Sequence, residues 1–362
     1  YNDSSMMEDN HNNDRFDFEM RRALLEDSPQ PDADRAFEQF KQRAGIRKSK
    51  WVMLRPYVAV AAAACVGALC YLIFSLGGDE DMGKAMEARQ RQLAGIGNVV
   101  YVADDNRNVI SLSLDGKTID LDAKSQGQKP GLLLTADKLV RMFEMSESDH
   151  DEATISVPHG QIATVMLSDS TRITLNAGSK LAFPCHFDKK GMRKVSLQGE
   201  GYFEVKHDER HPFVVNGKQL DVTVLGTVFD VRCFDQEQAR VALLQGKVSV
   251  EVAQQQTILE PGQMAVVGVS GFVSLETADI DQVLGWKNGL FYFDGQSLRE
   301  IMMEIGRWYN MSVVFASNHH IDERLHFSME RNVSVAEAIR QLQLISTASI
   351  QMKQEQNTII VK

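Results

Sequence analysis

The sequence predicts a multidomain membrane protein with a single transmembrane helix, an all-β domain of the sandwich or roll type, and a small α+β domain at its C-terminal end. Three patterns support this prediction. Residues 56–76 form an apolar run, residues 155–275 consist of short β-type segments, and residues 286–361 contain two strand–helix–strand patterns. A chain of 362 residues is long enough for all of these parts.

The three patterns divide the chain into five predicted parts. The predicted parts are a helical head at 1–50, a transmembrane helix at 51–78, a stem with a β-hairpin at 79–150, an all-β domain at 151–280 and a C-terminal α+β domain at 283–362, which repeats a strand–helix–strand unit.

The apolar run PYVAVAAAACVGALCYLIFSL at 56–76 has the length of a membrane-spanning helix. About 20 residues, each rising ~1.5 Å, cross the ~30 Å hydrocarbon core of a bilayer. The alternative is a helix buried in a globular core, but such a helix normally keeps a polar stripe, and Ser75 is the only strongly polar side chain here. Basic residues precede the span and acidic residues follow it, so the N-terminus is predicted to be cytoplasmic. The basic residues are Lys41, Arg43, Arg47, Lys48, Lys50 and Arg55, and the acidic ones are Asp79, Glu80 and Asp81.

The head contains two short amphipathic patterns. Phe16, Met20 and Leu24 fall on one face of the first predicted helix, and Phe37 and Phe40 fall on one face of the second. Two such helices bury little apolar surface against each other. We therefore expect the head to bind a partner through these five residues and to become ordered on binding; a poorly structured tail is the alternative.

The charge of the chain argues against one class of function, and its four cysteines bear on disulfide pairing. The net charge is −10 and the one basic cluster lies beside the span, which argues against a nucleic-acid-binding surface. Cys65 and Cys70 lie in the span and cannot pair with each other, because they occupy different helix faces. Cys185 and Cys233 lie in the exported part, where an oxidising compartment permits a bridge, but two unrelated buried thiols are the favoured interpretation.

Beyond the span, the periodicity predicts each element in turn. Residues 82–94 form a polar helical pattern, and 109–114 and 117–121 alternate about Asp115-Gly116, which is typical of a hairpin with a type I′ turn. From 155 to about 275 the spacing of β-type runs is roughly ten residues, with no helix of useful length. The last part predicts strands at 290–293, 313–316, 325–329, 350–352 and 358–361, and helices at 297–309 and 334–345 that begin at Ser297 and Ser334.

A series of short motifs in the β region is too specific for composition to explain. The motifs are Val157-Pro158-His159-Gly160, Leu167-Ser168-Asp169-Ser170-Thr171, Leu175-Asn176-Ala177-Gly178-Ser179, Gly199-Glu200-Gly201-Tyr202-Phe203-Glu204-Val205, His211-Pro212-Phe213-Val214-Val215, Val224-Leu225-Gly226-Thr227-Val228-Phe229-Asp230-Val231, Leu244-Gln245-Gly246-Lys247-Val248, Pro261-Gly262-Gln263 and Trp286-Lys287-Asn288-Gly289-Leu290-Phe291-Tyr292-Phe293. In this order and spacing they closely resemble the FecR family of transmembrane sigma-factor regulators, and the resemblance covers residues 151–362.

The motif residues are predicted to determine the fold, and none is implied to be catalytic. The usual Asp-Gly-Thr of the family is Asp169-Ser170-Thr171 here, so this turn is expected to be of another type. Gly226 and Gly246 are predicted to have positive φ or close backbone packing.

The resemblance implies a membrane-bound anti-sigma factor of the bacterial inner membrane, with a cytoplasmic N-terminus and a periplasmic C-terminus. Its head would bind an extracytoplasmic-function sigma factor. Its outer part would sense the periplasmic signalling domain of a TonB-dependent outer-membrane transducer, and staged proteolysis would release the head. The C-terminal unit resembles the short secretin/TonB N-terminal type of module. Phe291, Tyr292 and Phe293 are candidate transducer contacts, although strand alternation places at least one of them in the core.

Histidine patterns do not predict a metal site. His207 and His211 have the i, i+4 spacing of metal ligands, but that spacing brings ligands together on a helix, and Pro212 predicts a turn. His319 and His320 lie in a predicted loop. We expect no metal and no cofactor.

The sequence also predicts no enzyme. It has no Gly-rich phosphate loop, no Gly-x-Ser-x-Gly elbow and no His-Glu-x-x-His helix. Glu200 and Glu204 fall on the same face of a predicted strand, and a solvated face explains them most simply. The alternative function class is an envelope scaffold or glycan-binding protein without a sigma factor, and the apolar stripes of the head favour the regulator.

Overall fold

The computed structural model describes residues 80–104, 108–114, 117–121, 132–134, 152–188, 191–235, 237–253, 255–268, 271–346 and 350–362. The predicted head at 1–50 and the predicted span at 51–78 lie outside these ranges. Within them, no helix is both long enough and apolar enough to cross a membrane.

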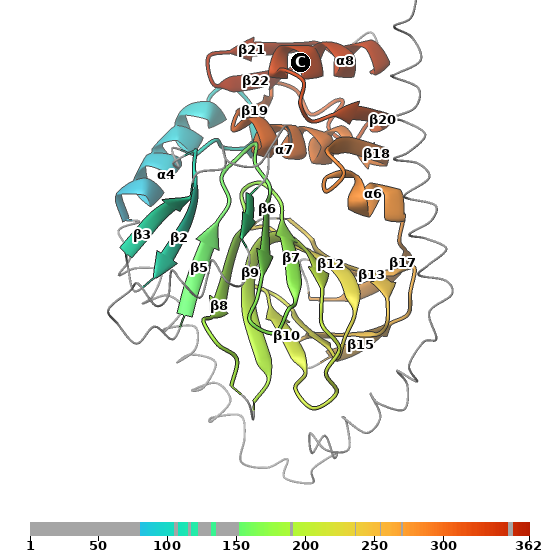
Figure 1. Cartoon of the computed structure of the whole chain (residues 1–362). Coiled ribbons are helices and arrows are strands. Elements are labelled where there is room, and N and C mark those ends of the chain that lie inside the picture. The colour runs from blue at the N-terminus through green and yellow to red at the C-terminus, as the bar shows by residue number, and fades with distance from the viewer. Residues whose placement is uncertain are drawn as a thin grey trace, which may run out of the picture. The chain divides into compact units, whose positions relative to one another are not determined.

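The β domain consists of two sheets that share one long strand, β9 (Arg193–Glu204). The first sheet contains, besides β9, the strands β2 (Ile110–Leu114), β3 (Lys117–Leu121), β5 (Glu152–Ser156), β8 (Lys180–Pro184), β10 (Phe213–Asn216), β11 (Asp221–Val224), β14 (Val248–Val252) and β15 (Gln255–Leu259). The second contains β4 (Leu132–Leu134), β6 (Ala163–Met166), β7 (Arg172–Leu175), β12 (Val228–Cys233), β13 (Ala239–Gln245), β16 (Gln263–Val267) and β17 (Val273–Thr277). The predicted all-β architecture is confirmed (Figure 1).

Strand β9 passes from one sheet to the other at Gly199. Its first half pairs with β8 and β10, and its second half pairs with β7 and β12. Gly199 has φ +113°, and a Cβ at this position would lie 2.5 Å from the Ser179 Oγ. Only glycine meets both requirements, so the residue permits the crossing.

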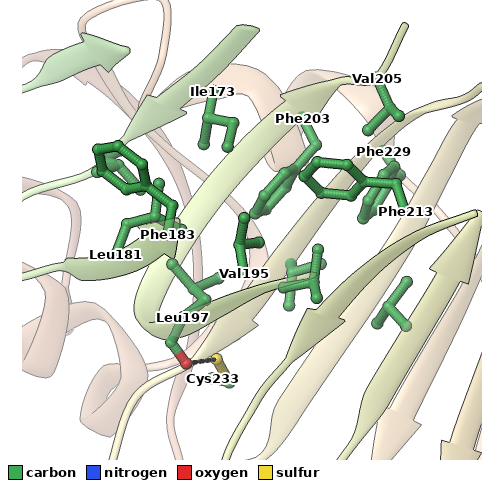
Figure 2. Packing of buried hydrophobic residues seen from close by; sticks show 14 of the residues in the cluster. Ile173, Leu181, Phe183, Val195, Leu197, Phe203, Val205, Phe213, Phe229 and Cys233 are labelled. Carbon is green, nitrogen blue, oxygen red and sulfur yellow. Dashed lines mark hydrogen bonds between the residues drawn. The ribbon is translucent and has the colours of Figure 1, made fainter. Parts of the chain in front are cut away.

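The core of the β domain lies between the two sheets and is rich in phenylalanine (Figure 2). The rings of Phe203 and Phe229 stack with centroids 5.0 Å apart, and the ring of Phe213 lies edge-on to Phe203 at 6.4 Å. All three side chains are fully buried. Burying one such side chain contributes about 1.5–3 kcal/mol.

The stem region does not form a separate part of the structure. Its helix α4 (Glu80–Ala94) confirms the helix predicted at 82–94. The predicted hairpin is also confirmed, because β2 and β3 pair antiparallel; the turn residues 115–116 are not among those described. However, β2 also pairs with β5, and β4 pairs with β6, so both belong to the β domain. Strand β1 (Asn98–Tyr101), which was not predicted, joins the C-terminal domain instead.

The C-terminal domain confirms the predicted repeat of strand, helix and strand. Its elements are β18 (Leu290–Ser297), α7 (Leu298–Tyr309), β19 (Ser312–Phe315), β20 (Arg324–Glu330), α8 (Val335–Ile345), β21 (Met352–Glu355) and β22 (Thr358–Val361). The strands form two sheets rather than one. Strands β18 and β20 pair with each other, and β1, β19, β22 and β21 form a four-stranded sheet in that order.

Serine caps begin both helices of the C-terminal domain, as predicted. The Ser297 hydroxyl accepts a hydrogen bond from the Glu300 amide, and the Glu300 carboxylate accepts one from the Ser297 amide, which completes a capping box. The Ser334 hydroxyl accepts from the Glu337 amide. A short helix that was not predicted, α6 (Ile280–Gly285), begins at the cap Asp279 and connects β17 to β18.

The predicted glycine roles are confirmed. Gly246 has φ +92°, and a Cβ on Gly226 would lie 2.4 Å from the His207 Cα.

In the Asp169 turn, Ser170 takes the left-handed φ of +69° that glycine would adopt more easily. The turn is closed by hydrogen bonds from the Ser170 amide to the Leu167 carbonyl and from the Leu167 amide to the Thr171 carbonyl.

We expect Gly226→Ala to lower the free energy of unfolding by about 1–3 kcal/mol, because the new methyl group would overlap the backbone at His207. Gly191→Ala is the matched control, since a Cβ there meets its nearest neighbour at an ordinary 3.6 Å. Urea unfolding of the full chain in detergent measures the free energy of unfolding of both variants. Equal losses in the two variants would show that the close approach at Gly226 does not constrain the fold.

Candidate functional site: the buried joint between the two domains

Helix α7 presents two charged residues within an otherwise apolar surface. Ile301, Ile305 and Trp308 are core residues of the C-terminal domain. Glu304 and Arg307 lie on the same helix and are only 7% and 4% exposed. Charged side chains are rarely buried to this extent unless they are paired. Their partners come from both the β domain and the C-terminal domain.

Three guanidinium groups converge on the carboxylate of Glu304. Arg232 of β12 donates to its Oε2 at 2.9 Å, and Arg307, one turn further along α7, donates to the same oxygen at 2.7 Å. Arg331, which directly follows β20, donates to Oε1 at 2.7 Å. Glu304 thereby links strand β12 of the β domain to two segments of the C-terminal domain.

Two further carboxylates complete the cluster. Glu200 of β9 accepts from Arg232 at 3.0 Å and from the Asn176 amide at 2.6 Å. Glu237 accepts from Arg232 at 2.8 Å and also pairs with Arg307. The cluster therefore holds three guanidiniums and three carboxylates, so its charges balance. We refer to these six residues as the joint cluster: Glu200, Arg232, Glu237, Glu304, Arg307 and Arg331.

Aromatic rings cover the guanidiniums of the joint cluster. Arg307 and Arg232 lie 3.7 Å and 5.0 Å from the centroid of the Phe234 ring. The guanidinium of Arg331 lies 4.7 Å from the Phe291 centroid and 4.8 Å from that of Trp308. Cation–π contacts strengthen when they are shielded from water, so the rings support the charges that they bury.

The joint cluster keeps Glu304 ionised. Burial by itself would raise the pKa of this carboxyl, but the charges and hydrogen bonds of Arg232 and Arg331 outweigh it and lower the pKa to about 2. The negative charge of Glu304 is therefore a permanent part of the joint at neutral pH.

A second buried carboxyl, Asp230, has the opposite behaviour. Burial and the neighbouring Glu200 raise its pKa well above the usual value. The indole of Trp286 lies close enough to lower this pKa in part, although neither its Nε1 nor the Asp230 Oδ2 makes a hydrogen bond of ordinary geometry among the described residues. Both residues line a cavity of about 100 Å³ between β12, α6 and β18. A cavity of this size accommodates water next to the two polar atoms.

The position of Glu200 corrects the prediction of a solvated face. Glu200 is only 5% exposed, whereas Glu204, four residues along the same strand, is half-buried. The alternation rule places both side chains on one face of β9, but the C-terminal domain covers one end of that face and leaves the other open. The Arg232 partner on the neighbouring strand lies directly opposite Glu200 in the register.

Comparisons with known proteins match one region on each side of this joint. The family model described as FecR protein matches residues 153–249, and the model described as FecR, C-terminal matches residues 290–361. Two crystal structures of a candidate anti-sigma factor from Parabacteroides distasonis ATCC 8503, at 1.65 Å and 2.50 Å resolution, are similar to this chain at 30% sequence identity. Each match covers 98% of that chain and 58% of this one, with TM-scores of 0.54 and 0.53. The chain belongs to the FecR family. A comparison with curated proteins finds no match.

The joint cluster connects the two FecR regions. Glu200, Arg232 and Glu237 lie in the FecR region, and Glu304 and Arg307 lie in the C-terminal FecR region together with Arg331. Sequence reasoning missed the cluster, although two signals were present. Asn176 and Glu200 belong to motifs typical of the family, and Glu304 interrupts the apolar face of α7.

The structure separates the three aromatic residues that were predicted to contact a transducer. Phe291 and Phe293 are 1% and 9% exposed and stack on each other in the core. Tyr292 points to the opposite face of β18 and is half-buried, so the expectation that alternation turns at least one ring inward is met. The five residues predicted to bind a sigma factor, Phe16, Met20, Leu24, Phe37 and Phe40, lie outside the described residues.

Several of the histidines considered as metal ligands have neighbouring acidic partners. The Nδ1 of His211 contacts Asp208 at 2.7 Å, and the Nδ1 of His320 contacts Glu323 at 3.2 Å. In the described ranges, no group of three His, Cys, Asp or Glu side chains is placed to hold a metal ion. Cys185 and Cys233 are buried thiols, and the Cys233 Sγ donates to the Leu197 carbonyl at 3.3 Å (Figure 2).

We expect Glu304→Ala to destabilise the protein by about 3–5 kcal/mol, because it leaves buried guanidiniums without their shared partner. Glu300→Ala, one turn earlier on the same helix, is the matched control. Glu300 pairs with Arg240 near the surface and contributes to the helix cap, so its loss should cost only about 1–2 kcal/mol. Urea unfolding of the full chain distinguishes the two, and similar losses would contradict the central place of Glu304.

The two shifted carboxyls predict a stability maximum in pH. The pKa of Glu304 lies below its usual value, so its contribution is present above the ordinary Glu pKa and is lost as pH falls toward 2. The pKa of Asp230 lies above its usual value, so its contribution is present at low pH and is lost as pH rises through the raised pKa. Glu304→Gln should flatten the acid side of the curve of unfolding free energy against pH, and Asp230→Asn should flatten the other side. Unchanged slopes would refute the assignment.

Proposed function

We propose that this protein is a transmembrane anti-sigma factor that binds an extracytoplasmic-function sigma factor in the cytoplasm and receives a signal outside the inner membrane. The observation that carries the proposal is membership of the FecR family, together with 30% identity over 98% of the crystallised chain of a candidate anti-sigma factor. The apolar run at 56–76 and the basic residues before it support a single span with a cytoplasmic head.

In this proposal the head at 1–50 holds the sigma factor through the stripes of Phe16, Met20 and Leu24 and of Phe37 and Phe40. A head of this size gains stable structure most readily by laying apolar helix faces on a partner. The charge pattern supports contact with a protein rather than with nucleic acid, because the chain carries a net charge of −10.

The outer part of the molecule is proposed to receive the signal from the periplasmic signalling domain of a TonB-dependent transducer. Tyr292 is the most accessible of the three aromatic candidates, and its pKa is raised by the negative charge of Asp279, by partial burial and by the charges of Asp294 and Asp281. Such a surface suits a partner that presents basic side chains. Staged proteolysis in or near the span would then free the head with its sigma factor.

The alternative of a glycan-binding scaffold receives little support from the described residues. A groove of about 710 Å³ runs between the stem and the β domain and contains Phe234. Glycan sites commonly offer an aromatic face, but guanidiniums of Arg232 and Arg307 lie over the Phe234 ring. The joint cluster therefore occupies the platform that a sugar would need.

The proposal is tested by capture of sigma factors on the full-length protein in detergent. We expect the wild type to retain one sigma factor of the source organism selectively, and Phe37→Asp/Phe40→Asp to lose it, because charge on the apolar stripe prevents helix docking. The control Gln39→Asp/Gln42→Asp adds the same charge to the opposite face of the predicted helix and should retain binding. Absence of any captured sigma factor from intact protein would favour the envelope scaffold.

A further inference from the structure

One strand of the C-terminal sheet comes from outside the C-terminal FecR region. Residues 290–361 provide β19, β22 and β21, which pair side by side in that order. The fourth strand, β1, lies between the stem helix α4 and the β domain and pairs antiparallel with β19. Strand β1 is thus added to the edge of the module within the same chain, in the manner of β-augmentation.

The two edges of the three-stranded module differ in their protection. At the β21 edge, Lys353, Gln354 and Glu355 are exposed, and charged residues are a common protection of a sheet edge. At the β19 edge, all four side chains of Ser312–Phe315 are buried and none is charged. Unpaired backbone groups beside such a strand are strongly prone to accept another strand. The β19 edge therefore requires a covering strand, whereas the β21 edge does not.

The pairing of β1 with β19 is short and irregular. Asn98 lies opposite Phe315 and Val99 opposite Val314, but the register shifts before Tyr101 reaches Val313. Val100 belongs to the core of the C-terminal domain, and Tyr101 packs against that core. A longer and regular strand would form a more extensive ladder with the same edge.

Contacts with residues next to β19 fix the two ends of β1. At its start, a Cβ on Gly97 would lie 2.2 Å from the Phe315 carbonyl oxygen, so the backbones approach closely only because residue 97 is glycine. After its end, the Ala103 amide donates to the Ser312 Oγ at 3.0 Å, and the Asp104 amide donates to the Asn310 side chain at 3.1 Å.

A histidine of the β domain secures the same segment. His159 lies with its Nε2 3.1 Å from the Asp104 carboxylate, and its Nδ1 contacts the Arg307 carbonyl at 2.5 Å. Its ring also meets the Tyr101 ring edge-on. These polar contacts lie beyond the strand itself, so they hold β1 in place without extending its ladder.

We propose that the β19 edge is a strand-exchange site, where β1 is the resident strand and an extended strand of the signal-delivering partner takes its place. The inference rests on the proposed function, because it adds a second contact for the same partner, in a different sheet from the surface around Tyr292. The partner strand would need a glycine at the place of Gly97, an apolar side chain at the place of Val100, and a ring at the place of Tyr101, where Gly306 leaves room for it. Release of β1 would free the end of α4 and so alter the stem.

The site is tested first with the resident strand itself as probe. A labelled peptide of residues 96–104 is titrated into the full chain in detergent. Gly97→Val should expel β1 through the clash at the Phe315 carbonyl, and should bind the peptide at least tenfold more tightly than the wild type does. Should Gly97→Val not fold, Val100→Asp serves as a second variant that expels β1 by placing a charge in the core.

Two controls define the site in this experiment. A peptide with the same Gly97→Val change should not bind, because it carries the clash itself. A disulfide in the double variant Val99→Cys/Val314→Cys, whose two positions lie directly opposite each other, should close the edge in an otherwise wild-type chain and abolish binding. A folded expelling variant that binds no peptide, or peptide binding that survives the disulfide, would overturn the strand-exchange site.

The partner is tested with the purified signalling domain of the cognate transducer. We expect it to bind the wild type and the reduced Val99→Cys/Val314→Cys variant, and to bind the oxidised form of that variant at least tenfold more weakly. Equal binding to the oxidised and reduced forms would overturn the exchange while leaving the proposed function intact. A signalling domain that does not bind the wild type would instead contradict the proposed function. The peptide titration would then still test whether the β19 edge accepts a strand.

Discussion

The position of the C-terminal domain on the β domain depends on the carboxylate of Glu304. Among the described residues, it is the one acid that receives a guanidinium from the β domain and two from its own domain, with Arg232, Arg307 and Arg331 at 2.7–2.9 Å. Helix α7 carries Glu304, and the core of the C-terminal domain packs around α7, so the joint fixes the orientation of the whole domain. A sliding movement between the domains would separate at least one of these pairs.

Buried ion clusters contribute more to geometry than to net stability. Removing charges from water costs several kcal/mol for each ion, and mutual attraction offsets this only when the geometry is good and the remaining lone pairs are satisfied. The joint meets that condition with balanced charge, the Asn176 amide and four cation–π contacts. Asp230 and Trp286, which border the same region, make no hydrogen bond of ordinary geometry and line a small cavity, so the packing is incomplete there.

Local periodicity predicted most of the helices and strands, but it could not predict contacts between residues that are far apart in the sequence. The hairpin of β2 and β3 and the capped helices α7 and α8 depend on residues within a few positions, so a local pattern was enough to predict them. The roles of Gly226 and Gly246 depend on His207 and Thr227, which are 19 residues away, and were predicted from the motifs of the family. The joint cluster and the pairing of β1 depend on residues far apart in the chain, which no local pattern encodes. Glu200 was assigned to solvent because alternation gives the face of a strand and not what covers it.

The place of β1 in the C-terminal sheet has a consequence for how the protein is made. Ala103 and Ser312, which meet beside this strand, are 209 residues apart. Strand β1 therefore remains unpaired until β19 has been synthesised, and contacts of such long sequence separation form slowly. A chain whose synthesis stops early leaves both β1 and the stem without their partner. Synthesis of the C-terminal domain thus completes the sheet that holds β1, and the strand is protected only at that point.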